Sequence, residues 1–174
     1  MQRSRSTPAP ARRRSALPII VNGRISRPRR VGVHVAPSPA LNVLDEAYDY
    51  GSAFSRGLRV EANGVITLFI SRTASIDKTG ETVHMGDFRA QLRKTFDNIT
   101  GLLAAEGVTW KDIVRTRCFL RDIDRDYTDF NLGRNEFFAE QGLNPFPAST
   151  GIEAKLCRPE LLVEIEAMAM FHIK

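Results

Sequence analysis

The sequence predicts a single α+β domain in which two helices pack on one face of a mixed sheet. The predicted segments follow in the order strand, strand, helix, strand, helix, strand, strand, which suits one sheet layer under both helices. An Asn63-Gly64 pair joins the first two strands, and the last strand has one fully apolar face. The 174 residues suffice for one complete core and are too few for two comfortable ones.

The first half of the domain predicts a hairpin followed by a helix. Residues 56–61 and 65–71 are two strands, because Asn-Gly is the strongest short hairpin signal. Asp87 caps a helix that runs to about Glu106 and ends at Gly107. Its apolar residues recur at helical spacing: Phe88, Leu92, Phe96, Ile99, Leu102 and Leu103.

The second half predicts a strand, a helix and two final strands. Residues 112–121 are rich in β-branched and aromatic side chains, which favours a strand. An amphipathic helix covers about residues 125–141 and ends at Gly142, and strands at 149–156 and 161–173 follow. The apolar stripe of this helix consists of Tyr127, Phe130, Phe137 and Phe138.

The last strand places two acidic side chains on one face. Because successive side chains alternate between faces, the apolar face consists of Leu161, Val163, Ile165, Ala167, Ala169 and Phe171. The other face combines Glu164 and Glu166 with Leu162, Met168 and Met170. We expect a half-buried polar site there, and the alternative is an ordinary solvated face.

The sheet face without helices needs a cover, and self-association is the expected one. Glu164 and Glu166 would then lie near a subunit boundary, where small-molecule clefts are common. Arg115 and Arg117 share one face of the preceding strand, so they are candidate ion-pair partners for the two acids.

The basic charge of the chain belongs to its N-terminal segment. The net charge is +5, but residues 1–44 hold nine Arg and no acid, which leaves residues 45–174 with −4. The Arg/Pro-rich segment 1–44 is predicted to be a flexible extension, because it cannot bury enough apolar surface to fold. Since the remaining domain is acidic, nucleic acid is not an expected partner.

The sequence predicts a cytoplasmic protein without metal, cofactor or membrane association. No apolar run approaches the length of a membrane span. Cys118 and Cys157 lack the further cysteines of a disulfide framework or zinc cluster, and the three His show no ligand spacing. Residues 1–44 also have the composition of an organelle transit peptide, so targeting by this segment is an alternative.

Several motifs occur in one unbroken order between residues 51 and 171. They are F-S-R-G, I-S-R-T-A-S-I-D-K-T-G-E-T-V-H-M-G-D, A-Q-L-R-K-T-F-D-N-I, F-N-x-x-R-x-x-F-F and L-C-R-P-E-L-L-V-E-I-E-A. Together they resemble the Rid superfamily, also called YjgF-like proteins. The resemblance implies a chorismate-mutase-like fold, a homotrimer with a central barrel, and ligand clefts between subunits. The best-known members hydrolyse enamines and imines to ammonia and a 2-oxo acid.

The resemblance also implies roles for individual residues. Glu164 matches the acid that holds the attacking water, and Asn131 matches an Asn that lines the cleft. Phe54 stands where an active-site Tyr is usual. Ser149 stands where the deaminases carry the Arg that grips the substrate carboxylate, and a hydroxyl cannot replace a bidentate guanidinium.

Position 72 is a second departure from the family pattern. The family usually reads I-S-G in the strand bordering the cleft, whereas this chain reads I-S-R and ends in Arg72. We hypothesise that Arg72 supplies the cation lost at Ser149; the alternative is a surface arginine at a strand end. Ser149 and Thr150 offer hydroxyls that could bind a carboxylate weakly.

A subset of these motifs also resembles the C-terminal halves of chorismatases. In some of those enzymes a Cys and a Glu spaced like Cys157 and Glu164 line the active site. Three functions therefore stay open. They are a hydrolase of enamines, imines or related small carboxylated metabolites, a chorismatase-like or other tailoring enzyme, and a non-catalytic trimer that binds small acids.

Overall fold

The computed structural model of the chain describes residues 19–21, 24–26, 32–38 and 54–173. The chain divides into two compact units, residues 1–31 and residues 32–174. The first unit contains a hairpin of β1 (Ile19–Val21) and β2 (Arg24–Ser26). Most of the predicted extension lies outside the described residues, so its flexibility and its targeting alternative stay predictions.

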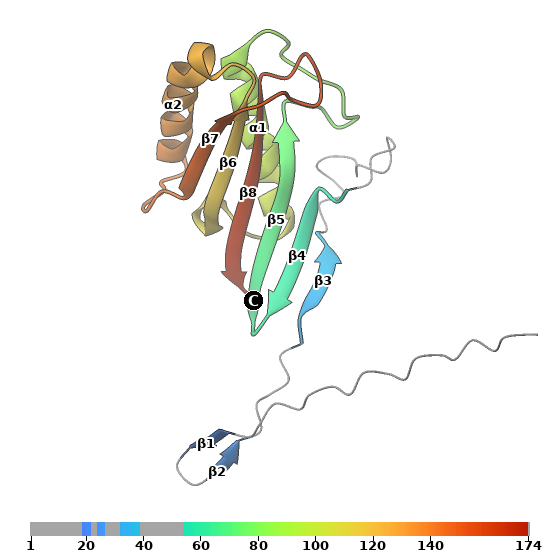
Figure 1. Cartoon of the computed structure of the whole chain (residues 1–174), viewed down its shortest axis with the longest axis vertical. Helices are drawn as coiled ribbons and strands as arrows, with labels where there is room; N and C mark the ends of the chain where they lie inside the picture. The colour runs from blue at the N-terminus through green and yellow to red at the C-terminus, as the bar shows by residue number, and fades with distance from the viewer. Residues whose placement is uncertain (1–18, 22–23, 27–31, 39–53, 174) are drawn as a thin grey trace, which may run out of the picture. The chain divides into compact units, whose positions relative to one another are not determined.

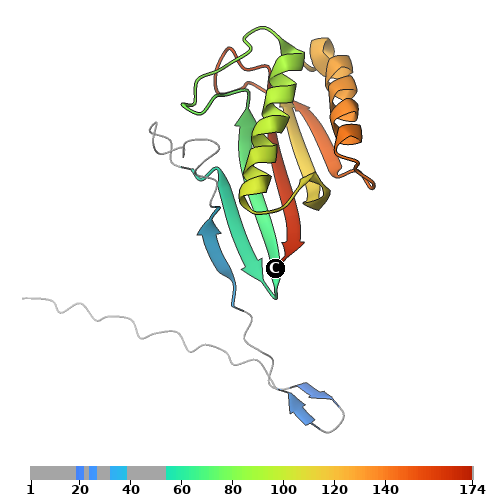
Figure 2. The same cartoon turned by 180° about the vertical axis from the view of Figure 1, so that it is seen from behind.

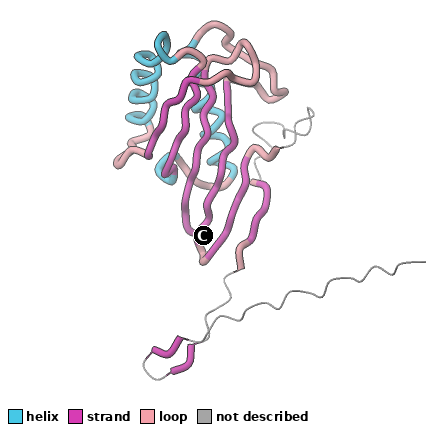
Figure 3. The backbone as a smooth tube through the Cα atoms, in the orientation of Figure 1, coloured by secondary structure: helices cyan, strands magenta, loops and turns pink. Residues whose placement is uncertain are grey.

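A six-stranded mixed sheet forms the base of the second unit (Figure 1). Its strand order is β3-β4-β5-β8-β6-β7, and every neighbouring pair is antiparallel except β6 and β7. The strands are β3 (His34–Pro37), β4 (Gly57–Ala62), β5 (Val65–Ala74), β6 (Ile113–Leu120), β7 (Ala148–Glu153) and β8 (Val163–His172). Figure 3 shows β8 between β5 and β6, in the middle of the sheet.

Both helices lie on the same face of this sheet, which confirms the predicted architecture (Figure 2). Helix α1 (Phe88–Ala105) connects β5 to β6 through a 3-10 turn, η2 (Trp110–Asp112), and helix α2 (Ile123–Glu140) connects the parallel strands β6 and β7. None of the helices in the described ranges is long and apolar enough to cross a membrane.

The local signals at the element ends act as predicted. Asn63 and Gly64 both have positive φ, 55° and 78°, as the tight turn of a two-residue hairpin requires. The Asp87 carboxylate accepts a hydrogen bond from the Ala90 backbone N–H at 2.9 Å and caps α1. Gly107 follows α1 with φ of 68°, a conformation that favours glycine.

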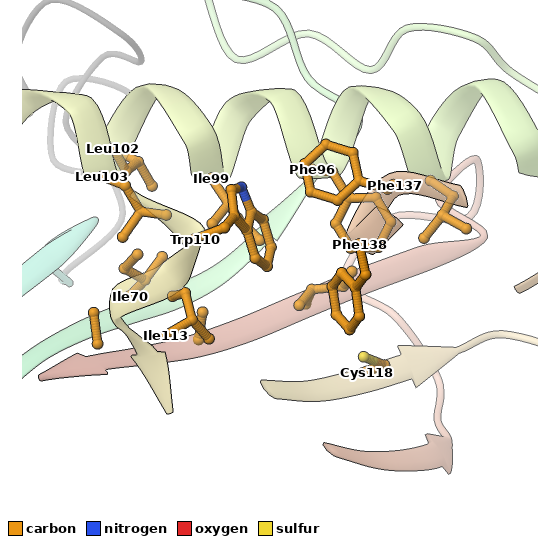
Figure 4. Close-up of a cluster of buried hydrophobic side chains, with 14 of the residues drawn as sticks. Ile70, Phe96, Ile99, Leu102, Leu103, Trp110, Ile113, Cys118, Phe137 and Phe138 are labelled. Atoms are coloured by element: carbon orange, nitrogen blue, oxygen red, sulfur yellow. The ribbon is translucent and has the colours of Figure 1, made fainter. Parts of the chain in front are cut away.

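An aromatic cluster joins the helices to η2 in the core (Figure 4). The Phe96 and Phe137 rings stack with centroids 4.5 Å apart, and the Trp110 ring meets both edge-on at 5.5 and 5.0 Å. The Trp110 indole N–H donates to the Thr100 hydroxyl at 2.8 Å, which satisfies its one polar atom. Trp110 and Cys118 are both core residues.

Three side chains lie on a different face from the predicted one. Tyr127 is 51% exposed, because the first turn of α2 directs Asp126 inward instead, where its carboxylate pairs with Arg125. Leu161 and Leu162 exchange faces: Leu161 packs in a second small cluster, while Leu162 packs against the main core. The reason is that β8 begins only at Val163, so the strand alternation does not extend to the two leucines.

Local hydrogen bonds hold this segment before β8. The Leu162 N–H donates to the Gln91 side chain at 2.9 Å, and the Leu161 carbonyl accepts from Arg121 at 2.6 Å. Strand β3 was not predicted; it pairs with β4 and lies inside the segment predicted as an extension.

Replacing Leu103 with Ala should lower the free energy of unfolding by about 3 kcal/mol, because the side chain is fully buried and leaves a cavity. Leu132→Ala is the matched control: the same change on a helix residue that is 50% exposed should cost less than about 1 kcal/mol. Denaturant unfolding of both variants at one protein concentration measures the difference. Equal losses would contradict the assignment of the core.

Candidate functional site

The acids of β8 lie on the face of the sheet that carries no helix, as the alternation predicts. Val163, Ile165 and Ala167 face the helices and belong to the main core. Residues directly opposed on neighbouring strands point to the same face, so the register extends this assignment to β5 and β6. Glu164 lies opposite Phe119, and Glu166 lies opposite Arg117. The helix-free face therefore carries both carboxylates, and we call it the open face.

Glu164 is a buried acid with an arginine partner. Only 4% of the residue is exposed, and Arg72 Nη1 lies 3.2 Å from its Oε2 atom. The Arg72 guanidinium also lies over the Phe119 ring, 5.0 Å from its centroid. The separation fits an ion pair, but no donor among the described residues is aligned for a hydrogen bond to Oε2. This oxygen therefore keeps unused acceptor capacity, although it is itself shielded from solvent in a single copy of the chain.

A bulge in β5 brings Arg72 onto the open face. Ile70 pairs with Ala167 and Thr73 with Ile165, so two residues of β5 stand opposite one residue of β8. The first of these two, Ser71, bonds backward to the preceding segment: its hydroxyl donates to the Ser55 carbonyl at 2.7 Å. The change from I-S-G to I-S-R thus falls at an irregular position, where an added side chain reaches the acid.

A second ion pair on the open face borders a hollow of about 370 Å³. Arg117 Nη1 lies 3.6 Å from Glu166 Oε2, so the predicted pairing of Arg117 with one of the acids is confirmed. The hollow is lined by Phe69, Ile70, Ser71, Arg115, Arg117, Glu166, Ala167 and Met168. Each acid of β8 therefore has its own arginine, which offsets the cost of placing two carboxylates on one face.

A second group of predicted site residues lies between β7 and α2. The Thr116 hydroxyl donates to the Ser149 hydroxyl at 3.0 Å, and Arg134 Nη1 donates to the same oxygen at 3.4 Å. Arg134 Nη2 donates to Asn131 Oδ1 at 2.7 Å. The structure thus brings Ser149 and Asn131 together through Arg134.

Arg134 had no predicted role, although it stands in the F-N-x-x-R motif. Its spacing of three from Asn131 places both residues on one helix face, and this was the signal that could have found it. The nearby Cys118 thiol offers no nucleophile: burial raises its pKa, although hydrogen bonds from Thr116 and Ser149 act in the opposite direction.

The two groups lie on opposite sides of the sheet. Thr116 is 2% exposed under the helices, and Ser149 stands beside it in the parallel register of β6 and β7. Glu164 and Arg72 lie on the open face. One copy of the chain therefore does not gather both groups around one cavity.

The remaining predicted residues lie apart from both groups or at the edge of the open face. Thr150 pairs in register with Arg117, which places it on the open face. Phe54 is 42% exposed and packs under the Arg56 guanidinium. Cys157 is exposed and lines a separate hollow, whose lining includes neither Glu164 nor Arg72.

A comparison with protein families shows which family this chain belongs to. The family described as Endoribonuclease L-PSP matches residues 48–171. The chain belongs to this family. It is the Rid or YjgF family predicted from the motifs.

Characterised relatives include two proteins named as deaminases. The 3-aminoacrylate deaminase RutC of Acinetobacter baylyi is 31% identical over 102 residues, which cover 59% of this chain and 77% of the relative. The 2-iminobutanoate/2-iminopropanoate deaminase of Escherichia coli is 34% identical over 93 residues, which cover 53% and 70%. The crystal structure of the Escherichia coli YjgF gene product aligns with a TM-score of 0.58 at 30% identity, covering 68% of this chain and 88% of the other.

A double-mutant cycle between Arg72 and Glu164 should give a coupling free energy of about 1 kcal/mol, because the carboxylate is buried and the guanidinium is 39% exposed. The variants are Arg72→Ala, Glu164→Gln and the combination of both, measured by denaturant unfolding. Arg93 and Glu140, an ion pair on the exposed sides of the two helices, supply the control cycle, which should stay below about 0.5 kcal/mol. Equal coupling in both cycles would show that burial gives the first pair no special strength.

Proposed function

We propose that this protein hydrolyses small imine or enamine acids to 2-oxo acids and ammonia. The observation that carries the proposal is the Glu164 carboxylate, which is buried beside Arg72 and keeps Oε2 without an aligned donor. The names of the two deaminase relatives support the same reaction.

The geometry suits the positioning of a water molecule. In the proposed reaction, Glu164 accepts a hydrogen bond from water and receives a proton as the water oxygen attacks the iminium carbon. Transfer of that proton to nitrogen lets the carbon–nitrogen bond break, and ammonia leaves as the hydroxyl group gives its proton to the Glu164 carboxylate and the carbonyl forms. Arg72 compensates the charge of a carboxylate that is otherwise enclosed by Phe119 and the strand backbone.

We further propose that the chain forms a homotrimer through its open face. Large apolar side chains remain exposed on this face, and Leu58, Phe69 and Met170 are 37%, 41% and 46% exposed. They share the face because Leu58 pairs with Phe69, while Met170 alternates with the acids of β8. An assembly would cover this patch.

The separation of the two residue groups supports the same assembly. A cleft between copies would combine Arg72 and Glu164 from one chain with Asn131 and Ser149 from its neighbour. Contacts between unlike surfaces close into a ring when the rotation allows it, and three copies make the smallest such ring beyond a pair. The substrate in this proposal is a small carboxylated metabolite bound between two subunits.

Imine hydrolysis can be measured by generating a 2-imino acid with an amino acid oxidase and recording how much of it semicarbazide captures. Wild-type protein should lower the captured fraction, and Glu164→Gln should slow hydrolysis by about 100-fold or more, because it removes the proton acceptor. Glu166→Gln is the matched control and should retain most of the activity. Turnover of chorismate without imine turnover would favour the chorismatase-like alternative, and no turnover of either would favour a binding protein.

Light scattering of the purified chain should give a mass of about 58.5 kDa, three times the chain mass of 19.5 kDa. Phe69→Glu should reduce the trimer, because it buries a carboxylate without a partner in the proposed interface. Ala104→Glu, at an exposed residue of helix α1, serves as the surface control. A wild-type monomer would refute the assembly.

A further inference from the structure

The proposed substrates carry a carboxylate, and position 149 holds a serine where a guanidinium would bind it. Arg134 lies against this position, since its Nη1 atom is 3.4 Å from the Ser149 hydroxyl. We propose that Arg134, on helix α2, binds the substrate carboxylate in place of an arginine on strand β7. This inference rests on the proposed function and assigns a residue to its carboxylate subsite.

The charge of Arg134 is not neutralised within the described part of the chain. Arg72 pairs with Glu164 and Arg117 pairs with Glu166, whereas the partners of Arg134 are a side-chain amide, a hydroxyl and an aromatic ring. None of these partners carries a negative charge. Arg115 in the hollow of the open face also has no ion pair among the described residues, but Arg134 is the arginine that contacts Ser149, and its charge is available to an incoming anion.

The guanidinium is held in place before any ligand arrives. Asn131 accepts from Nη2 at 2.7 Å, one helical turn earlier, and the Phe130 ring lies under the guanidinium at 4.8 Å. These contacts limit the rotamers of a long side chain, which lowers the entropy lost on binding. The bond to Ser149 is long, so most of the five guanidinium N–H donors remain for a carboxylate.

The strand beside Arg134 leaves room for a ligand. Strand β7 is exposed along its whole length. A Cβ atom placed on Gly151, two residues beyond Ser149 on the same strand face, would meet no heavy atom within 4 Å. Small side chains on β7 and a cation supplied from α2 thus create a position for a carboxylate, with the Ser149 hydroxyl as an additional donor.

Binding of 2-oxobutanoate, a stable product analogue, tests the inference by calorimetry on the full chain. Arg134→Gln should weaken binding by about 10-fold or more, since it removes a charged donor pair, while binding of the uncharged methyl 2-oxobutanoate should not change. Arg93→Gln removes one positive charge from the exposed side of α1 and is the control, with unchanged affinity expected. Melting temperature and assembly state must match the wild type.

A rescue variant separates a binding role from a structural one. Arg134→Gln combined with Ser149→Arg restores a guanidinium at the strand position, and it should recover most of the lost affinity for 2-oxobutanoate. If Arg134 only held α2 against β7, the Ser149→Arg change would not recover the affinity. If Arg134→Gln does not fold, Arg134→Lys keeps the charge without the planar pair of donors and should still weaken binding.

Three results would overturn the inference. They are wild-type affinity in the Arg134→Gln variant, a loss confined to Arg72→Ala, and no binding of 2-oxobutanoate by the wild type. The proposed reaction fails separately: wild-type binding without imine turnover refutes hydrolysis but leaves the Arg134 subsite in place. Turnover with an unchanged KM in Arg134→Gln refutes the subsite and leaves hydrolysis in place.

Discussion

The alternation of β8 in the middle of the sheet is the constraint on which the rest of the structure depends. Because β5 and β6 pair with it on both sides, its register decides which face every neighbouring side chain takes. Val163, Ile165 and Ala167 turn toward the helices, which commits Glu164 and Glu166 to the open face. A shift of one residue would place two carboxylates in the core, so the apolar packing itself holds the acids in position.

Two arginines, Arg72 and Arg134, determine the electrostatics of the site. Arg72 arises at a bulge, where an extra residue can project without breaking the ladder, and it offsets a buried charge. Arg134 comes instead from a helix and approaches a strand that has a serine at the corresponding point. Arg72 and Arg134 thus determine where positive charge lies around the sheet, without altering the scaffold itself.

Local signals made most of the fold predictable, and the errors occurred where a distant contact prevailed. The positive φ values at Asn63 and Gly64 and the cap at Asp87 are short-range effects that any context would preserve. Leu161 and Leu162 were assigned to the wrong faces because the Gln91 side chain from α1 holds the chain before β8 begins. Tyr127 was assigned to the apolar stripe of α2 by its spacing, but the residue that is buried in the first turn of this helix is Asp126, which pairs with Arg125.

The amino-acid pattern alone was enough for the α+β class, the faces of β8 and the placement of both acids beside arginine-bearing strands, since strand and helix periods are intrinsic to the backbone. Only the tertiary structure decided that Arg72 meets Glu164 and that Arg134 meets Ser149. The first contact depends on a two-against-one bulge, and the second joins a helix to a strand that lies 15 positions further along the chain. Neither contact can be predicted from sequence spacing, because each follows from how separate elements pack.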